Sequence, residues 1–452
     1  MAETPFVSAA MMNRIAQAAF DAGIVGAGGA GFPTHIKLQA KAEYLLINGA
    51  ECEPLLHKDK ELLKQFAPTV IQGALLAAEA IGANHVICGL KEKYTDVVEA
   101  VRKAADGTGV EVRLFGNFYP SGDEYVVVYE CTGRLIPPAG LPLHVGCVVT
   151  NVETLYNVGV AASEGQPVTH KFLTVNGVVG QPVSVRVPIG ASMQDVLGMS
   201  GRLPSSETAA LDGGAMMGHL RTDFSFPVSK TSGGYIVLPA DHYLIRRRSM
   251  TKTDMHRKGH SACDQCSYCT EFCPRFLLGY EVEPHKVMRS LLFAGQQKEK
   301  YWSQWGQLCC ECNLCSLYAC PEDLDPKDAC VWSKQVFREA QAPAPEWVQP
   351  ERPHPFSESR KVPLPKLIRR LGLEPYDHPA PWSDAALEPE SVRIPLKQHI
   401  GQACVAAVGI GDRVETGQII GRVPDGQLGA PVHASIAGRV TGIDSHVRIA
   451  RE

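Results

Sequence analysis

The sequence has no long hydrophobic run, no basic excess and no signal-like N-terminus. Its longest apolar stretches, such as Ala74–Ala78 and Val145–Thr150, are far shorter than the ~18–20 residues that span a bilayer. The opening residues, MAETPFVSAA, lack the basic start and the apolar core of a secretory signal. With 44 Lys and Arg against 48 Asp and Glu, the net charge is −4, which does not favour a nucleic-acid partner. We therefore expect a cytoplasmic protein without a membrane span.

The composition predicts a multidomain protein of α/β and β units. Its 452 residues suffice for about two to four domains, and 45% hydrophobic residues can form real cores. Apolar runs at Tyr44–Asn48, His85–Leu90 and Glu111–Phe115 predict strands, while Ser8–Asp21 and Pro68–Ile81 predict helices. Residues 1–165 are therefore expected to form an α/β domain.

The rest of the chain changes character four times. Residues 166–245 contain segments rich in β-branched residues, which predict strands, and Asn176-Gly177 predicts a hairpin between two of these strands. Residues 255–335 carry most of the cysteines, and 341–390 contain eleven prolines, which indicates an extended linker or a wrapping arm. Residues 391–452 return to short strands and glycine turns.

Ten of the 15 cysteines lie between Cys263 and Cys330, in a chain too long for a small disulfide scaffold. Two runs share one pattern, in which three closely spaced cysteines are followed by a Cys-Pro pair. The runs are Cys263, Cys266, Cys269, Cys273 and Cys309, Cys312, Cys315, Cys320. Such spacing is typical of two [4Fe-4S] clusters, where the fourth cysteine of each run binds the other cluster.

The predicted ligand sets are thus Cys263, Cys266, Cys269 with Cys320, and Cys309, Cys312, Cys315 with Cys273. Zinc is the alternative, but each four-cysteine zinc site needs two Cys-x2-Cys pairs rather than triplets ending in Cys-Pro. The second run has one extra residue before its last cysteine, and Cys310 leaves its register open. Cys330 and five scattered cysteines are interpreted as small buried hydrophobic residues.

A glycine loop follows the first predicted helix. Gly26, Gly28 and Gly31 give a formal G-x-G-x-x-G, but a dinucleotide fingerprint needs a preceding strand. Glycines still allow backbone N–H groups to approach a phosphate, and Pro33 can begin a helix whose N-terminus favours an anion. A plain glycine-rich turn is the alternative interpretation.

Four motifs in order accompany this loop: GAGGAGFPTHIK at 26–37, NGAECEPLLHKD at 48–59, YPSGDE at 119–124 and NVET at 151–154. Together they resemble the flavin- and NADH-binding subunit of respiratory complex I, and more closely the C subunit of Rnf electron-transfer complexes. The run GGAMMG at 213–218 is similar to a Gly-Gly-Pro-Met-Met-Gly motif of the second family. The resemblance covers about residues 8–335.

The order of domains refines this resemblance. A barrel-like hybrid domain precedes the flavin domain in Rnf subunits, whereas a similar segment, Ile394–Asp444, comes last here. This arrangement resembles the cobalamin reductases of propanediol-utilising bacterial microcompartments. The resemblance implies a complex I flavoprotein-like α/β domain, a small β-grasp-like domain, a two-cluster ferredoxin-like helical module and a C-terminal barrel-sandwich hybrid.

The resemblance also implies a binding site for FMN and NADH. The glycines would pack against the flavin and the nicotinamide, Lys37 would meet the phosphate or ribityl chain, and Glu53, Glu124 and Phe32 would hold NADH, with the two glutamates as the catalytic positions. The remaining cofactor-binding residues would be Gly26, Gly28, Gly29, Gly31, Asn48, Glu51, Tyr119, Gly122, Asp123, Asn151 and Thr154. Ala50 and Asp123 depart from complex I, which has Asp and Glu there. The alternative without a functional role is that Glu51, Glu53 and Glu124 are ordinary surface carboxylates.

The activity implied is electron transfer from NADH through FMN and two [4Fe-4S] clusters to cobalamin, for reactivation of a B12-dependent diol dehydratase in a microcompartment. Expected partners are cobalamin or a cobalamin adenosyltransferase, together with shell proteins. A soluble Rnf-C-like subunit that feeds other proteins is one alternative. A non-catalytic, cluster-containing assembly module is another.

Two further motifs carry less weight. Asp254, His256 and Gly259 match the D-x-H-x-x-G of corrinoid domains, but Cys263 follows too soon for that fold, so a basic linker is the preferred interpretation. The C-terminal segment resembles lipoyl and biotinyl carriers, yet no lysine follows Lys397 to hold a prosthetic group.

Overall fold

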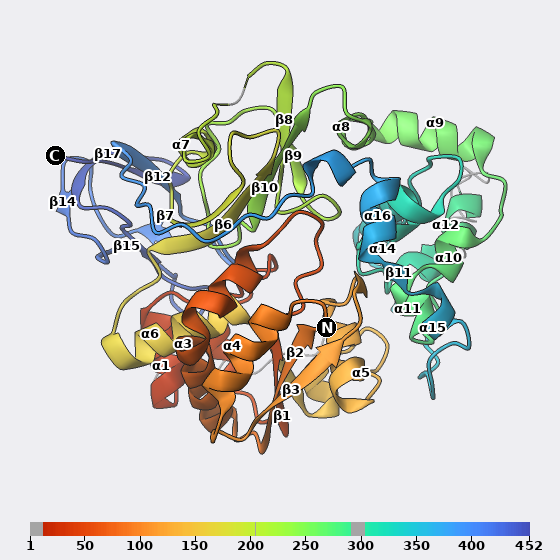
Figure 1. Ribbon diagram of the computed structural model, residues 1–452, viewed down its shortest axis with the longest axis horizontal. Coiled ribbons are helices and arrows are strands. Elements are labelled where there is room, and N and C mark those ends of the chain that lie inside the picture. The colour runs from red at the N-terminus through yellow and green to blue at the C-terminus, as the bar shows by residue number, and fades with distance from the viewer. Residues whose placement is uncertain (1–11, 204, 291–302) are drawn as a thin grey trace.

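A computed structural model of the chain describes residues 12–203, 205–290 and 303–452. Figure 1 shows the N-terminal α/β unit at the bottom, a β-rich unit above it, the C-terminal strands at the left and the cysteine-rich helices at the right. Over these residues no helix has the length and apolar character needed to cross a membrane.

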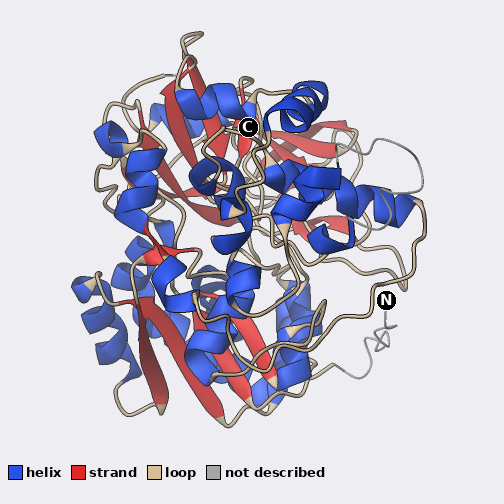
Figure 2. Cartoon of the chain, turned by 90° about the vertical axis from the view of Figure 1, so that its right-hand side faces the viewer, coloured by secondary structure: helices blue, strands red, loops and turns tan. Residues whose placement is uncertain are grey.

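The N-terminal unit is built on a parallel sheet in the order β3-β2-β1-β5, with helices on both sides (Figure 2). Its strands are β1 (Tyr44–Asn48), β2 (His85–Lys91), β3 (Val110–Phe115) and β5 (Cys147–Asn151). Its helices are α1 (Arg14–Asp21), α2 (Thr34–Lys37), α3 (Lys58–Ile81), α4 (Thr95–Ala105), α5 (Glu124–Thr132) and α6 (Val152–Glu164), with the short β4 (Phe118–Tyr119) and η2 (Pro142–Val145). The strands are apolar because helices cover both faces of such a sheet.

Two predicted helices differ in their limits. Of the predicted helix Ser8–Asp21, residues 8–11 lie outside the described part, and α1 covers Arg14–Asp21. The prediction that the next helix starts at Pro68 is wrong, because α3 begins at Lys58 and bends at Phe66 (φ −128°). The bend places Pro68 in the first turn of the second half, where its missing N–H costs little. The first half escaped prediction because its buried residues are largely charged.

The second unit is a mixed sheet in the order β7-β6-β10-β8-β9, in which β6 and β10 run parallel. Its elements are β6 (His170–Gly177), β7 (Val183–Pro188), α7 (Met193–Gly198), β8 (Thr208–Asp212), β9 (His219–Arg221) and β10 (Gly234–Pro239). This order, with one helix, is the β-grasp arrangement that the resemblance implies.

The predicted two-residue turn at Asn176-Gly177 is wrong, although β6 and β7 do form an antiparallel pair. Both residues lie inside β6, and Val178–Pro182 makes the connection. Gly177 (φ +100°) is needed because a Cβ there would lie 2.0 Å from the Val237 carbonyl oxygen on β10. The glycine permits close approach of two strands instead of making the turn.

The C-terminal unit pairs two small sheets, β12-β18-β17-β14 and β13-β15-β16, as a barrel-like sandwich. Its strands are β12 (Ser391–Pro395), β13 (Val405–Ala406), β14 (Arg413–Val414), β15 (Ile419–Arg422), β16 (Val432–His433), β17 (Gly438–Ile443) and β18 (His446–Ala450). Ile394, Ile420 and Val447 share one buried apolar core with α1, α3 and α6. The end of the chain is therefore packed onto the N-terminal unit.

The cysteine module is helical and the proline-rich segment crosses its surface. The helices are α8 (Tyr243–Arg248), α9 (Lys252–Ala262), α10 (Tyr268–Glu271), α11 (Pro274–Leu277), α12 (Pro284–Ser290), η4 (Ser303–Gly306), η5 (Cys315–Ala319) and α14 (Pro326–Glu339). The proline-rich segment contributes α15 (Ser357–Arg360), β11 (Val362–Pro363), α16 (Leu364–Arg370) and η6 (Glu374–Tyr376). Strand β11 pairs with β4, and Leu367 shares a core with Leu56, Met216 and Leu317. The proline-rich segment thus joins the first two units to the cysteine module.

Candidate functional site

The carboxyl edge of the parallel sheet gathers several predicted residues. Asn48 ends β1 and Asn151 ends β5, and the two are directly paired in the sheet. The Asn48 side chain donates to the Gly122 carbonyl at 2.9 Å, while the Asn151 amide donates to Asp59 at 2.8 Å. Ligands of open α/β sheets bind at this edge. Asn48, Gly122 and Asn151 therefore lie where a cofactor is expected.

The glycine loop closes over the same edge. Ala27 donates its N–H to the Thr154 hydroxyl at 3.0 Å, and Gly26 donates to the Phe32 carbonyl at 2.9 Å. Gly29, at φ +110°, is exposed, and a Cβ there would meet nothing within 4 Å. The loop follows a helix and not a strand, so it is no dinucleotide fingerprint. It leaves open backbone that a flavin or nicotinamide can approach.

Gly31 has a different task. At φ +67° a Cβ on Gly31 would lie 2.9 Å from Thr231 and 3.3 Å from the Gln398 carbonyl oxygen. Its own carbonyl accepts the N–H of Ile400 at 3.0 Å. Gly31 therefore lets the β-grasp and C-terminal units close against the loop.

Lys37 and Glu124 meet at the mouth of this edge. The Lys37 ammonium donates to the Val149 carbonyl at 2.9 Å and lies 3.5 Å from the Glu124 carboxylate. The two side chains are 32% and 41% exposed, so the pair adds little stability and can contact a ligand. The structure brings together the residues assigned to the flavin phosphate and to NADH.

A buried charge network beneath the loop was not predicted from the sequence. Lys58 contacts Asp59 at 2.6 Å and Glu153 at 3.2 Å, and Lys171 also contacts Glu153. The Lys171 ammonium reaches the Ala27 carbonyl at 3.4 Å. Burial lowers the pKa of Lys171 to about 8, although Glu153 opposes the shift. The network holds the glycine loop in place, and its sequence signals were Glu153 of the NVET motif and Lys58 and Asp59 of the motif at 48–59.

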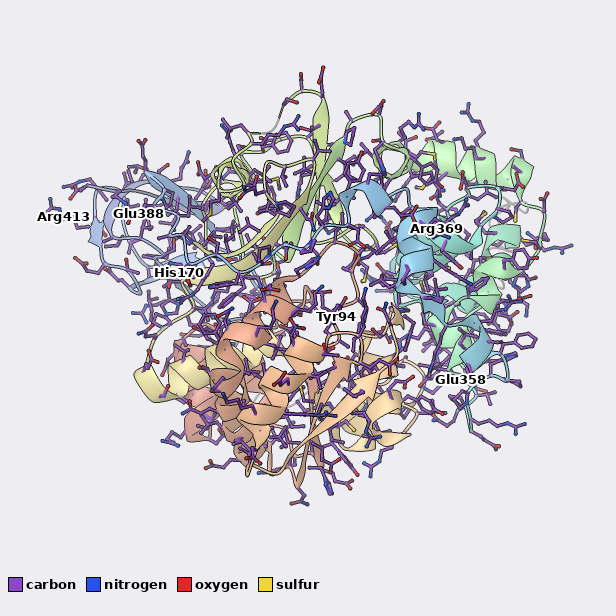
Figure 3. All side chains as sticks on the ribbon, viewed as in Figure 1. Tyr94, His170, Glu358, Arg369, Glu388 and Arg413 are labelled. Carbon is purple, nitrogen blue, oxygen red and sulfur yellow. The ribbon has the colours of Figure 1, made fainter. Side chains whose placement is uncertain are left out.

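Lys91 indicates that the carboxyl edge of the parallel sheet fits an anionic cofactor. It ends β2, is 1% exposed, and its ammonium has no hydrogen-bond partner within the part of the chain that the structure describes. Burial lowers its pKa, while Cys52 and Glu51 oppose the shift. Nearby Lys60 lies 4.3 Å above the ring of Tyr94, which Figure 3 labels between the units. This surplus of buried cations fits a cofactor that brings negative charge, as FMN does.

Glu53 contacts the GGAMMG loop of the β-grasp unit. Its two carboxylate oxygens accept the N–H groups of Met216 at 2.8 Å and Met217 at 2.9 Å. A Cβ on Gly214 would lie 2.5 Å from the carboxylate. Neighbouring Glu51 accepts the Glu53 N–H at 3.1 Å, and burial raises its pKa. The contacts described for Glu53 are therefore structural, whereas the resemblance assigns it to NADH.

Glu53→Gln should change how stability depends on pH. Burial raises the pKa of Glu53 to about 7 from 4.5, although the two N–H groups favour the carboxylate. Protonated Glu53 therefore stabilises the fold. This stabilisation is fully present below the unfolded pKa of 4.5 and is lost as pH rises through about 7, because Glu53 releases its proton more readily in the unfolded chain. Glutamine cannot ionise, so the melting temperature of the variant relative to wild type should rise between about pH 5 and 8. If the difference in melting temperature between the variant and wild type stayed constant over this pH range, the raised pKa of Glu53 would be contradicted.

Tyr119 and Asp123, both assigned to the flavin, also contact the cysteine module. The buried Tyr119 hydroxyl donates to the Cys312 carbonyl at 2.8 Å. The Asp123 carboxylate pairs with Arg275 through both oxygens, at 3.0 and 3.1 Å, and accepts N–H groups at the start of α5. Both contacts link the cysteine module to the carboxyl edge of the parallel sheet, which we call the flavin edge. Cys312 belongs to the second cysteine run, and Arg275 follows the last cysteine of the first run by two positions. Sequence reasoning missed these links because no local pattern joins the partners.

Cys263, Cys266, Cys269 and Cys320 line one cavity of about 360 Å3. These are the four cysteines that the spacing assigns to one cluster. Four thiols in one cavity, with Pro321 directly after Cys320, suit an iron–sulfur cluster, although Asp264, His285 and Glu322 also line the cavity. Within the described residues, no group of three or more His, Cys, Asp or Glu side chains is arranged to hold a single metal ion.

The second set is gathered around Cys273. Cys312 lies near Cys273 and Cys315, and Cys273 has both Cys309 and Cys310 as neighbours. The thiol of Cys309 also forms a hydrogen bond with the free, buried thiol of Cys330, a contact that the cysteine spacing did not predict.

Backbone geometry indicates the register of the second run. In the first run, Gln265 and Ser267 have positive φ, at 57° and 68°. In the second run, Glu311 and Asn313 do, at 62° and 70°. These residues stand at matching offsets when Cys309 is aligned with Cys263. The shared turn geometry therefore favours Cys309 over Cys310 as the first ligand.

The D-x-H-x-x-G run is helical and not a linker. Asp254, His256 and Gly259 all lie in α9, whose first turn is capped by the Thr251 side chain. The His256 ring lies edge-on to the ring of Trp332, with 6.1 Å between the two ring centres. A regular helix here agrees with setting aside the corrinoid-domain interpretation.

The parallel sheet with its glycine loop, joined to paired cysteine runs, defines an iron–sulfur flavoprotein. The family described as Nuo51 FMN-binding domain matches residues 19–160, the 4Fe-4S dicluster domain matches 262–325 and the RnfC barrel sandwich hybrid domain matches 381–452. FMN and [4Fe-4S] clusters are thus the cofactors of this NAD-linked oxidoreductase.

Comparison with curated proteins gives the particular family. The chain is 41% identical to the cobalamin reductase PduS of Salmonella typhimurium and 40% identical to that of Citrobacter freundii, each over 93% of both chains. It is 31% identical to the C subunit of the proton-translocating ferredoxin:NAD(+) oxidoreductase complex of Clostridium ljungdahlii, over 57% of this chain and 55% of that one. The chain belongs to the PduS cobalamin reductase family.

Proposed function

We propose that the protein moves electrons from NADH through FMN and two [4Fe-4S] clusters to cobalamin. The supporting observation is the direct contact between the flavin edge and the cysteine runs, through Tyr119 to Cys312 and Asp123 to Arg275. The electrons balance when one NADH yields NAD+ and a proton while two cob(III)alamin become two cob(II)alamin. FMN, when bound, accepts hydride and releases single electrons, which iron–sulfur clusters carry.

The chain's own residues would bind and orient these groups. The glycine loop and Lys37 would hold FMN, with Asn48, Asn151 and Thr154 completing its pocket. Phe32 and Glu124 would position NADH at the exposed side of the loop. The eight cysteines of the two sets would hold the clusters. The hydrogen bonds of Tyr119 to Cys312 and of Arg275 to Asp123 would hold the flavin site against the cysteine module.

The biological setting that we propose is a bacterial microcompartment. Reduced cobalamin would pass to a cobalamin adenosyltransferase and support reactivation of a B12-dependent diol dehydratase. Shell proteins would be the structural partners. The named relatives, both cobalamin reductases PduS, support this setting.

One experiment separates this proposal from its two alternatives. Anaerobically purified protein should contain flavin and iron, NADH should bleach the visible absorption of the flavin, and added aquocobalamin should then become cob(II)alamin. An Rnf-C-like subunit would show bleaching without cobalamin reduction and would capture a protein acceptor. An assembly module would show no bleaching by NADH, and either outcome would overturn the proposal.

Glu124→Gln should raise the KM for NADH, and Lys37→Ala should lower flavin retention. A lost charge-assisted hydrogen bond of ~1.5–3 kcal/mol corresponds to a roughly 10- to 150-fold change in binding. Each residue should act through its ligand and not through folding, because their mutual contact is long and partly exposed. Steady-state kinetics and the flavin-to-protein ratio measure the two effects. Loss of flavin in the Glu124 variant with full retention in the Lys37 variant would reverse the assignment.

A further inference from the structure

An open cavity of about 590 Å3, including the solvent at its mouth, lies where the β-grasp unit meets the cysteine module. One wall is formed by Gly218, the last residue of the GGAMMG loop, and by His219 and Leu220 of β9. Another wall contains Asn313 and Leu317, which stand between cysteines of the second run. The cavity is separate from the glycine loop and from the cavity lined by Cys263. Its position beside the second run is that of an exit for electrons.

Hydrogen bonds hold these walls in place. Asn313 donates to the Met216 carbonyl at 3.0 Å, and Arg248 donates to the same carbonyl at 3.1 Å and also to that of Gly218. The N–H group of Met216 in turn donates to Glu53 of the flavin-binding unit. The loop is thus tied to both the flavin edge and the second cysteine run. A binding site between these elements would be largely formed before its ligand arrives.

The charges lining the cavity leave a positive surplus. Arg247, Arg248 and Lys327 stand against Asp325 and Asp328, so the sum is 3 − 2 = +1. Arg247 pairs with Asp325 at 2.7 Å, and Lys327 pairs with Asp328. Among the described residues, Arg248 has no carboxylate within ion-pair distance. The cavity therefore offers hydrogen-bond donors, acceptors and one cation without an ion-pair partner in the described part of the chain, although Glu53 and Asp328 lie close enough to attract it.

The apolar part of the lining comes from Leu220, Leu317, Met250 and Met255. A ligand that suits the whole lining has an apolar face, a rim of groups that both donate and accept, and a single negative charge. A corrinoid has this chemistry, because its macrocycle carries carboxamide arms and its nucleotide arm carries one phosphodiester. A dinucleotide such as NADH carries two phosphates, which the carboxylates would repel.

We propose that this cavity is the docking site of cobalamin, an inference that rests on the proposed function. The cavity is open to solvent and far smaller than a corrinoid, so it takes one edge of the macrocycle and the remainder stays outside. Leu317 and Asn313 would then lie against both the bound corrinoid and the second cysteine run. Arg248 would neutralise the phosphodiester or donate to a carboxamide.

The test fills the cavity from two sides. Leu220→Trp and Met255→Trp add bulk to different walls, whereas Met217→Trp adds it to an exposed neighbour that does not line the cavity. Aquocobalamin is titrated anaerobically into each oxidised holoprotein, and NADH-dependent cobalamin reduction is measured alongside. Both filled variants should bind aquocobalamin at least about tenfold more weakly than wild type and the Met217 variant. Iron, flavin and NADH:ferricyanide activity should be unchanged.

The outcomes separate the site from the function. If wild type and both filled variants bind and reduce cobalamin equally, the docking site is wrong and the proposed function stands. If loaded wild type reduces ferricyanide but neither binds nor reduces cobalamin, the proposed function fails and the docking site with it. Should the tryptophans cost iron, Lys327→Glu turns the +1 lining into −1 and should weaken binding several-fold, and unchanged binding there would overturn the site.

Discussion

Cys312→Ala should remove one [4Fe-4S] cluster and leave the other. Cys312 lies near Cys273 and Cys315 and does not line the cavity of the other set. Iron should therefore fall from about eight to about four atoms per chain, since each cluster contains about four. NADH should still bleach the flavin, while cobalamin reduction should be lost. Iron analysis with electron paramagnetic resonance of the reduced protein measures this result.

Cys266→Ala and Cys310→Ala are the matched comparisons. Cys266 belongs to the first set, so its variant should lose the cluster that the Cys312 variant keeps. Cys310→Ala should retain both clusters, because the matching positive-φ residues of the two runs align Cys309 with Cys263. Full iron in both the Cys266 and Cys312 variants would refute the ligand sets. Loss of a cluster in the Cys310 variant would shift the second run by one residue.

Asp123→Asn should separate the flavin edge from the cysteine module. The Asp123–Arg275 ion pair contains one hydrogen bond, its side chains are 14% and 10% exposed, and the Arg275 guanidinium lies 3.5 Å from the centre of the Tyr125 ring. Removing one partner of a buried pair leaves an uncompensated charge and costs ~3–5 kcal/mol. Asparagine can still cap α5, so the loss should come from the ion pair. Urea unfolding followed by flavin fluorescence and cluster absorption measures it.

Lys361→Ala supplies the control for that experiment. Lys361, beside the proline-rich segment's α15, pairs with Glu130 of α5 at 2.8 Å, but both side chains are more exposed. Ion pairs of this kind contribute at most ~1 kcal/mol. A loss as large as that of the Asp123 variant would show that the buried pair has no special role at this interface.

Local patterns predicted those parts of the molecule that depend on neighbours in sequence. Strand β1 covers the predicted residues Tyr44–Asn48, because a parallel strand buried on both faces is apolar throughout. Cysteine spacing grouped Cys263, Cys266 and Cys269 with Cys320, which the structure brings to one cavity. That these four cysteines hold one cluster together remains a prediction.

Contacts between units escaped prediction because their partners are far apart in sequence. Tyr119 and Asp123 belong to a motif that the resemblance assigns to the flavin. No neighbouring residue in the sequence indicates that they contact Cys312 and Arg275. Glu53 likewise gave no sign that it would accept N–H groups from Met216, 163 residues away. The charged start of α3 was missed for a related reason, since buried ion pairs such as Lys58–Glu153 mimic a polar loop.

The central claim is that NADH electrons leave the protein on cobalamin after passing through flavin and clusters. Its most direct test is an anaerobic titration of the loaded protein with NADH in the presence of excess aquocobalamin, followed by optical and electron paramagnetic resonance spectroscopy. The account predicts flavin bleaching, reduced-cluster signals and about two cob(II)alamin per NADH, because hydride carries two electrons and each cobalt accepts one. Cobalamin that stays oxidised while NADH reduces the flavin and the clusters would contradict it.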